Sequence, residues 1–103
     1  MSPFAAIEPD AFPWFDYRRY TFSLGLTHGP HAYLSGHSAS EYDPDEGHIV
    51  VKGGLAQQTR TAWAKVERLL EAAGLGLGDV IRVVENVTAD GVDDYPEAEQ
   101  VRL

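Results

Sequence analysis

The chain has 103 residues, 44% of them hydrophobic and 11% aromatic, and its formal net charge is −8. A chain of this length forms one domain around a single core, and its composition is that of a globular protein rather than a disordered one. Because cysteine is absent, disulfides and thiolate metal sites are excluded. The acidic balance disfavours binding to a nucleic-acid backbone, which depends on clustered Lys and Arg. We find no secretory signal and no apolar run near the ~18 residues of a membrane helix, and therefore expect a cytoplasmic protein.

The first 16 residues are expected to form an extended N-terminal arm. Pro3, Pro9 and Pro13 fix backbone angles and remove hydrogen-bond donors, which disfavours a helix. The arm is rich in aromatic side chains, which suggests that it packs against the rest of the chain. These side chains are Phe4, Phe12, Trp14 and Phe15.

A hairpin is predicted next, with strands over residues 17–25 and 31–36 joined by a glycine–proline turn. Residues 38–47 are polar, and their Asp-Pro-Asp-Glu-Gly run predicts a loop with turn chemistry. This run lacks the full ligand series of a calcium-binding EF-hand loop. Residues 48–51 are predicted as a short third strand.

A long amphipathic helix is predicted over residues 57–73. From Leu55 onward, apolar residues recur at spacings of three and four, which places them on one helix face. Gly74 stands where a left-handed residue would end the helix. The broad apolar face requires a sheet to pack against. The charged residues expected to face water are Arg60, Lys65, Glu67, Arg68 and Glu71.

Residues 79–88 are rich in β-branched side chains and predict a further strand. A second helix is expected to begin at Tyr95, with proline in its first turn, where it is tolerated. The predicted order is therefore β-β-β-α-β-α.

Short motifs in this order and at these distances make the chain resemble the RidA/YjgF family of enamine/imine deaminases. The resemblance runs from about Tyr20 to the last residue, so that residues 17–103 form the RidA-like domain behind the arm. The motifs are Tyr33-Leu-Ser-Gly36, the Asp-Pro-Asp-x-Gly loop at 43–47, Gln57-Gln-Thr-Arg60, Leu70-Glu-Ala-Ala-Gly-Leu75, Leu77-Gly-Asp-Val80 and Asp93-Asp-Tyr95.

The resemblance implies an α+β fold, a mixed sheet backed by two helices, and barrel-like homotrimers with sites in the clefts between subunits. It further implies hydrolysis of a small carboxylate-bearing imine or enamine to a 2-oxo acid and ammonia, without a cofactor. The family's carboxylate-gripping arginine and a water-positioning glutamate belong to a segment that follows the second helix, and neither is in this sequence. We therefore expect a second polypeptide, from a split gene or a cleaved chain, to supply them.

Several site residues follow from the same alignment. His37 stands where relatives often carry glutamine, and Phe22 falls on the family's site tyrosine, which Tyr20 could replace with a small shift. Glu99 aligns near an asparagine that lines the cleft. With Ser35, these residues make up the expected pocket.

The residues themselves indicate a site at Ser35-Gly36, because glycine at a strand end lets backbone amides approach an anion closely; a simple turn is the alternative. His37 could move protons near neutral pH. Glu85 suits acid–base work if Val83 and Ile81, two and four residues away, face the core with it. In the alternative, Glu85 is solvated.

The four histidines at positions 28, 31, 37 and 48 are spread over two strands and a loop, so we expect no metal site. Two further functions stay open. One is a biosynthetic lyase, hydrolase or cyclase in a reshaped cleft, and the other is a non-catalytic metabolite-binding module.

Overall fold

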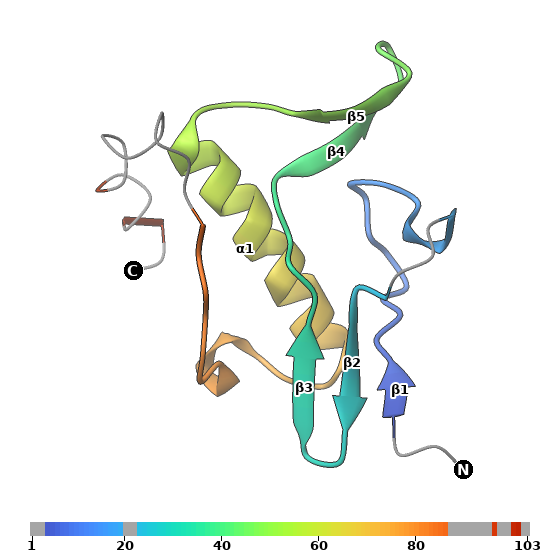
Figure 1. Ribbon diagram of the computed structural model, residues 1–103, viewed down its shortest axis with the longest axis vertical. Helices are drawn as coiled ribbons and strands as arrows, with labels where there is room; N and C mark the ends of the chain where they lie inside the picture. Colours follow the sequence, from blue (N-terminus) through green and yellow to red (C-terminus); the bar gives the residue numbers. More distant parts are fainter. Residues whose placement is uncertain (1–3, 20–22, 87–95, 97–99, 102–103) are drawn as a thin grey trace.

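The computed structural model describes residues 4–19, 23–86, 96 and 100–101. Antiparallel strands lie beside one main helix, which confirms the α+β class (Figure 1). The elements are β1 (Phe4–Ala6), a 3-10 turn (Tyr17–Arg19), β2 (Gly25–His28), β3 (His31–Leu34), β4 (Ser40–Asp43), β5 (His48–Val51), α1 (Leu55–Ala72) and a second 3-10 turn (Leu77–Asp79).

The strands form two small antiparallel sheets. One has the order β1-β2-β3, and the other is the hairpin β4-β5. The β2–β3 hairpin turns at Gly29, whose positive φ of 59° favours glycine. This turn lies where the sequence predicted it, and Leu26 pairs with Tyr33 across it.

The bounds of the predicted strands need correction. Residues 17–19 form a 3-10 turn, and β2 begins only at residue 25. The reason is Tyr17, whose buried ring belongs to the core and whose hydroxyl donates to the Pro9 carbonyl at 2.9 Å. That anchor favours a compact turn over an extended strand. The expected arm also contains a strand, β1, which pairs with β2.

The expected loop at 38–47 is in part a strand, since β4 pairs with β5 from Ser40 to Asp43. Its predicted turn is confirmed at residues 44–47. The Asp43 carboxylate accepts the backbone N–H of Asp45 at 2.8 Å and that of Glu46 at 3.3 Å. Gly47 completes the turn with a φ of 77°.

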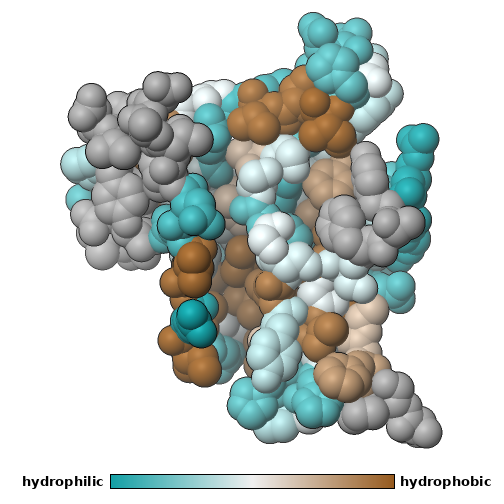
Figure 2. Space-filling view, viewed as in Figure 1, coloured by the Kyte–Doolittle hydropathy of each residue, from teal (hydrophilic) through white to brown (hydrophobic). Residues whose placement is uncertain are grey.

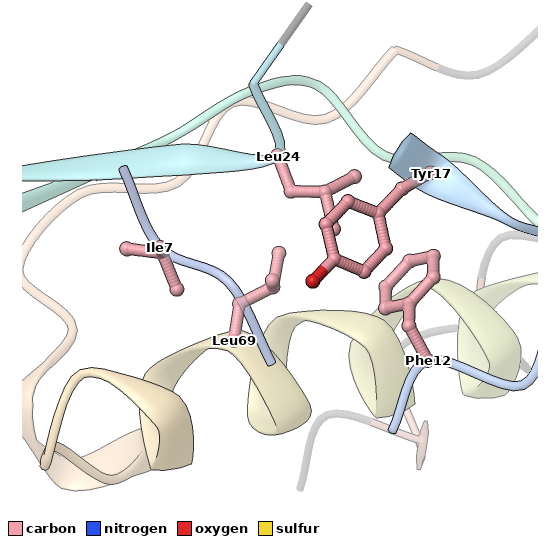
Figure 3. Close-up of a cluster of buried hydrophobic side chains, with 5 residues drawn as sticks. All are labelled: Ile7, Phe12, Tyr17, Leu24 and Leu69. Carbon is pink, nitrogen blue, oxygen red and sulfur yellow. The ribbon is translucent and has the colours of Figure 1, made fainter. Parts of the chain in front are cut away.

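Five buried side chains, which come from the arm, from the chain around β2 and from α1, form the core (Figure 3). Ile7 and Phe12 come from the arm, and Leu69 points up from α1 toward Leu24 and Tyr17. Phe12 and Tyr17 meet edge to face, with ring centroids 5.7 Å apart. The aromatic arm therefore packs against the rest of the chain, as its composition suggested.

The long helix is confirmed over residues 55–72, two residues earlier at its start than predicted. It ends at Gly74, which has a φ of 78°, while the Leu75 N–H donates to the Leu70 carbonyl at 2.7 Å. Leu69 and Leu70 lie on its buried face. Lys65, predicted to face water, is only 1% exposed, so that prediction is wrong.

The strand predicted over residues 79–88 is not formed in its described part. Residues 77–79 make a 3-10 turn, and residues 80–86 have no regular secondary structure. A strand persists only when a neighbour pairs with its backbone, and among the described residues none pairs with this segment. Its apolar side chains are exposed, including Ile81 (93%), Val84 (70%) and Val83 (48%).

Figure 2 shows hydrophobic surface along this segment, on the left, and over the β4–β5 hairpin, at the top, where Ile49 and Val51 are exposed. Of the predicted second helix, the structure describes residues 96, 100 and 101, and all three are helical. None of the helices among the described residues combines the length and apolar character needed to span a membrane.

Candidate functional site

The candidate site lies in residues 35–39, between the end of β3 and the start of β4. The Leu24 carbonyl holds this segment, accepting the Ser35 N–H at 3.0 Å. The Ser35 hydroxyl donates to the Ser23 carbonyl. Both donors of Ser35 therefore bond to the chain beside β2, which leaves its hydroxyl oxygen as an acceptor.

Gly36 is the open point of the segment. A Cβ built on it would meet no atom within 4 Å, so the space beside its backbone is free. Within the described residues, neither Gly36 nor His37 donates its backbone N–H to a hydrogen bond. Adjacent free N–H groups next to open space are suited to hold an anion.

His37 is half-buried, and its Nε2 lies 3.0 Å from the same Leu24 carbonyl that holds Ser35. Since a carbonyl oxygen only accepts, Nε2 carries the hydrogen in this contact, and Nδ1 is the basic atom of the neutral ring. Burial lowers the pKa of His37 below 6.5, the Leu24 contact opposes this, and the charge of Lys65 lowers the pKa further. His37 is therefore neutral at pH 7 and can act as a base.

Lys65 is the residue that sequence reasoning missed. Its Nζ donates to the Ser40 carbonyl at 2.6 Å and to the Ser40 hydroxyl at 3.2 Å. Burial lowers its pKa to about 8, and the nearby Glu41 carboxylate works in the opposite direction. The spacing held the signal, because Lys65 lies three residues after Ala62 and four before Leu69, on the apolar stripe itself.

The other predicted site residues are not gathered in this segment. Glu85 lies on the exposed segment 80–86, and its predicted neighbours Ile81 and Val83 do not form a buried face. In the described structure Glu85 therefore follows the alternative, an exposed side chain, because no described strand pairs with this segment, and its catalytic role stays a prediction. Tyr20, Phe22 and Glu99 lie outside the described residues.

Of the remaining histidines, His28 and His31 pair across the β2–β3 hairpin, and His48 lies in β5. His28 stacks on Phe4 with ring centroids 4.3 Å apart, and His48 Nε2 lies 3.9 Å from Glu46. No group of three His, Asp or Glu side chains in the described part of the chain is arranged to hold a metal ion.

A pocket of about 370 Å³ lies elsewhere, between the arm and β4. It contains none of the site residues predicted from the sequence. Its lining residues are Phe12, Pro13, Phe15, Asp16, Arg19 and Tyr42.

The model of the Ribonuc_L-PSP family, described as endoribonuclease L-PSP, matches residues 17–102. The chain belongs to this family, the RidA/YjgF family. The resemblance seen in the sequence motifs is thereby confirmed. No curated protein matches the chain. The match begins at Tyr17, so the RidA/YjgF region excludes the arm and three aromatic rings that surround Lys65, those of Phe12, Trp14 and Phe15.

Proposed function

We propose that the chain is a RidA-like hydrolase, which converts a reactive imine or enamine carrying a carboxylate into a 2-oxo acid and ammonia. One observation carries the proposal. A half-buried histidine, neutral at pH 7, directly follows a glycine that has open space at its Cβ position and whose backbone N–H donates to no hydrogen bond within the described residues. A base beside an anion-binding backbone is what water addition to a carboxylate-bearing imine requires.

In the proposed reaction, the N–H groups of Gly36 and His37 hold the substrate carboxylate, and Nδ1 of His37 accepts a proton from water. The oxygen of that water bonds to the imine carbon, and the imine nitrogen takes up a proton, which gives a carbinolamine. The proton that His37 took from water is the one given to the imine nitrogen. The carbinolamine hydroxyl then gives its proton through His37 to the nitrogen as the carbon–nitrogen bond breaks, which releases ammonia and leaves the 2-oxo acid. His37 ends the cycle neutral, and no electrons are exchanged with a cofactor.

Completion of the site is part of the proposal. A further segment would supply an arginine for the carboxylate and a strand for residues 80–86, and the completed domains would form homotrimers, as the family resemblance implies. The exposed apolar side chains of that segment support this, because a β-branched stretch without a pairing partner exposes its backbone and side chains to water. Phe22 or Tyr20 would form a wall of the pocket.

The test is ammonia release from imino acids generated in situ, measured against their hydrolysis in buffer. His37→Gln is the matched variant, because glutamine keeps a donor for the Leu24 carbonyl and removes the base. Since relatives often carry glutamine at this position, wild-type rates in the variant would show that the base lies elsewhere. We expect the purified assembly to accelerate ammonia release. The rate of release should fall at least about 100-fold in the variant, which is the low end of general-base contributions. Release no faster than in buffer would reject the proposal.

A metabolite-binding module is the alternative. Gly36 supports it equally, because an anion-binding backbone needs no base to hold a carboxylate. Such a module would be stabilised thermally by 2-oxo acids without any turnover. Profiling substrates with the same assembly tests the other reading, a lyase or cyclase in a reshaped cleft.

RNA cleavage, which the family's description names, is disfavoured for this chain. Eight Lys and Arg stand against sixteen Asp and Glu. Of the two lysines, Lys65 is buried, and Lys52 is paired with Glu41 at 3.6 Å and Asp43 at 3.4 Å. Binding to phosphates depends on accessible, clustered cations.

A further inference from the structure

We propose that Lys65 is a positioning residue of this site, whose buried ammonium group fixes the segment carrying His37 against α1 and joins that segment to the aromatic arm. The inference rests on the proposed function, but its principal readout, the state of His37, needs no turnover. Lys65 does not need to touch the substrate to act in this way.

The first support is the contact between Lys65 and Ser40. The ammonium group donates to two atoms of Ser40, the carbonyl oxygen at 2.6 Å and the hydroxyl at 3.2 Å. Ser40 stands three residues after His37, at the start of β4. On its other side, His37 is held by the Leu24 carbonyl at 3.0 Å. The segment is thus fixed at both ends, by β2 and by α1.

The second support is the arm. The Lys65 Nζ lies 5.0 Å from the ring centroid of Phe15 and 5.9 Å from those of Phe12 and Trp14. A cation within about 6 Å of an aromatic ring is attracted by the ring's quadrupole. The arm is also tied to β4, since the Tyr42 N–H donates to the Trp14 carbonyl at 2.6 Å. Lys65, which lies on α1, therefore contacts both the arm and the site segment.

The third support is the energetic disadvantage of a lysine at this position. Leucine or methionine would fill the same place on the apolar stripe without the desolvation that lowers the Lys65 pKa to about 8. A buried charge is worse for stability than a packed apolar side chain of similar volume, so its presence indicates a requirement for specific geometry or charge.

The charge of Lys65 also affects the pKa of His37. Below about pH 8 Lys65 is protonated, and its charge adds to burial in lowering the His37 pKa. Among the described residues, the charged group that raises the Lys65 pKa is Glu41 of β4, and Lys65 in turn acts on His37 of the site segment, while aromatic rings of the arm face the Lys65 Nζ. Lys65 therefore helps to keep His37 in the neutral, base-competent form.

The experiment compares Lys65→Met with Lys65→Arg, using Lys52→Met as the control. Lys52 also faces Glu41, but from an exposed position directly after β5. The His37 titration is followed by NMR, with its signal assigned from the spectrum of His37→Gln. The pH profile of ammonia release and the separate kcat and KM values are measured on the same samples.

For Lys65→Met we expect the His37 pKa to rise and the acid limb of the rate profile to move to higher pH. We expect kcat to fall about tenfold, or about 1.4 kcal/mol of barrier, with KM changed less. In Lys65→Arg the acid limb should lie closer to its wild-type position than in Lys65→Met. Lys52→Met should leave the His37 pKa and the acid limb unchanged. If Lys65→Met does not fold, Lys65→Gln, which keeps a donor for Ser40 without the charge, gives the same titration.

A folded neutral variant with the wild-type His37 titration and pH profile would overturn the proposal. If the wild type releases no ammonia, the proposed reaction fails on its own. The NMR titration would then still decide the role of Lys65.

Discussion

The N-terminal arm and residues 80–86 both contain little regular secondary structure and many apolar side chains, but they differ in how far these side chains are buried. The arm places Ile7 and Phe12 in the core, at 5% and 9% exposure, whereas Ile81 is 93% exposed. The arm has partners for both backbone and side chains, because β1 and the Ile7 N–H bond to β2 and the Phe12 ring packs in the core. Segment 80–86 is β-branched, and such side chains are buried once a neighbouring strand pairs with their backbone. Burial thus depends on the available partner and not on composition alone.

The largest effect expected from this comparison is on stability. Phe12→Ala should lower the free energy of unfolding by about 3–5 kcal/mol, because it removes a buried ring at the centre of the core. Ile81→Ala, the matched control on the exposed segment, should change it by less than about 0.5 kcal/mol. Chemical denaturation of both variants measures the contrast. Equal losses would show that segment 80–86 is buried in solution.

The next prediction concerns the buried lysine. The unfolded chain holds the Lys65 proton up to pH 10.5, while the folded chain releases it near pH 8. The unfolded state therefore binds more protons between these values, and the free energy of unfolding rises with pH across that window. We expect Lys65 to contribute about 1–3 kcal/mol to this rise.

Lys65→Met is the control for that rise, because other groups titrate in the same window and only the difference between the two proteins belongs to Lys65. Denaturation at pH 7.5 and at about pH 10 gives this difference. Identical pH dependence in the two proteins would show that Lys65 is not buried as described.

A smaller effect is expected where the arm meets the chain at Tyr17. Tyr17→Phe keeps the buried ring and removes the hydrogen bond to the Pro9 carbonyl at 2.9 Å. The carbonyl is left without this donor, so the free energy of unfolding should fall by about 1–2 kcal/mol. Thermal unfolding would detect it, and a loss as large as that of Phe12→Ala would mean that the ring itself had moved.

The smallest effect on the isolated chain should come from Val84→Thr, a polar near-isostere on the exposed segment. We expect less than about 0.5 kcal/mol, because Val84 is 70% exposed. In the completed assembly the same change should weaken association, measured by native mass spectrometry across dilutions. An unchanged dissociation profile would remove this segment from the proposed interface.

The sequence predicted the features that depend on local chemistry. The spacing from Leu55 predicted α1, Gly74 marked its end, and the glycine–proline pair marked the β2–β3 turn. The motifs between Tyr33 and Tyr95 predicted the family. Each of these signals lies within a few residues of the feature it specifies.

The features that were missed depend on distant partners. The residues of β4, Ser40-Glu-Tyr-Asp43, have almost no apolar pattern, and the strand exists because β5 pairs with it. Lys65 was predicted to face water because it is charged. Its position on the apolar stripe and three aromatic rings from the arm bury it instead. At the site, Ser35 and His37 were predicted, but their common anchor, the Leu24 carbonyl just before β2, is not identified by local patterns.

The central claim is that His37, neutral and held by Leu24, is the base that adds water to an imine. The most direct test is the rate of ammonia release by the purified assembly and by His37→Gln, measured from pH 5 to 8.5. We predict acceleration over buffer with an acid limb below pH 6.5, the ordinary value that burial lowers, and loss of that acceleration in the variant. Wild-type rates in His37→Gln, or no acceleration by the assembly at any pH, would contradict the claim.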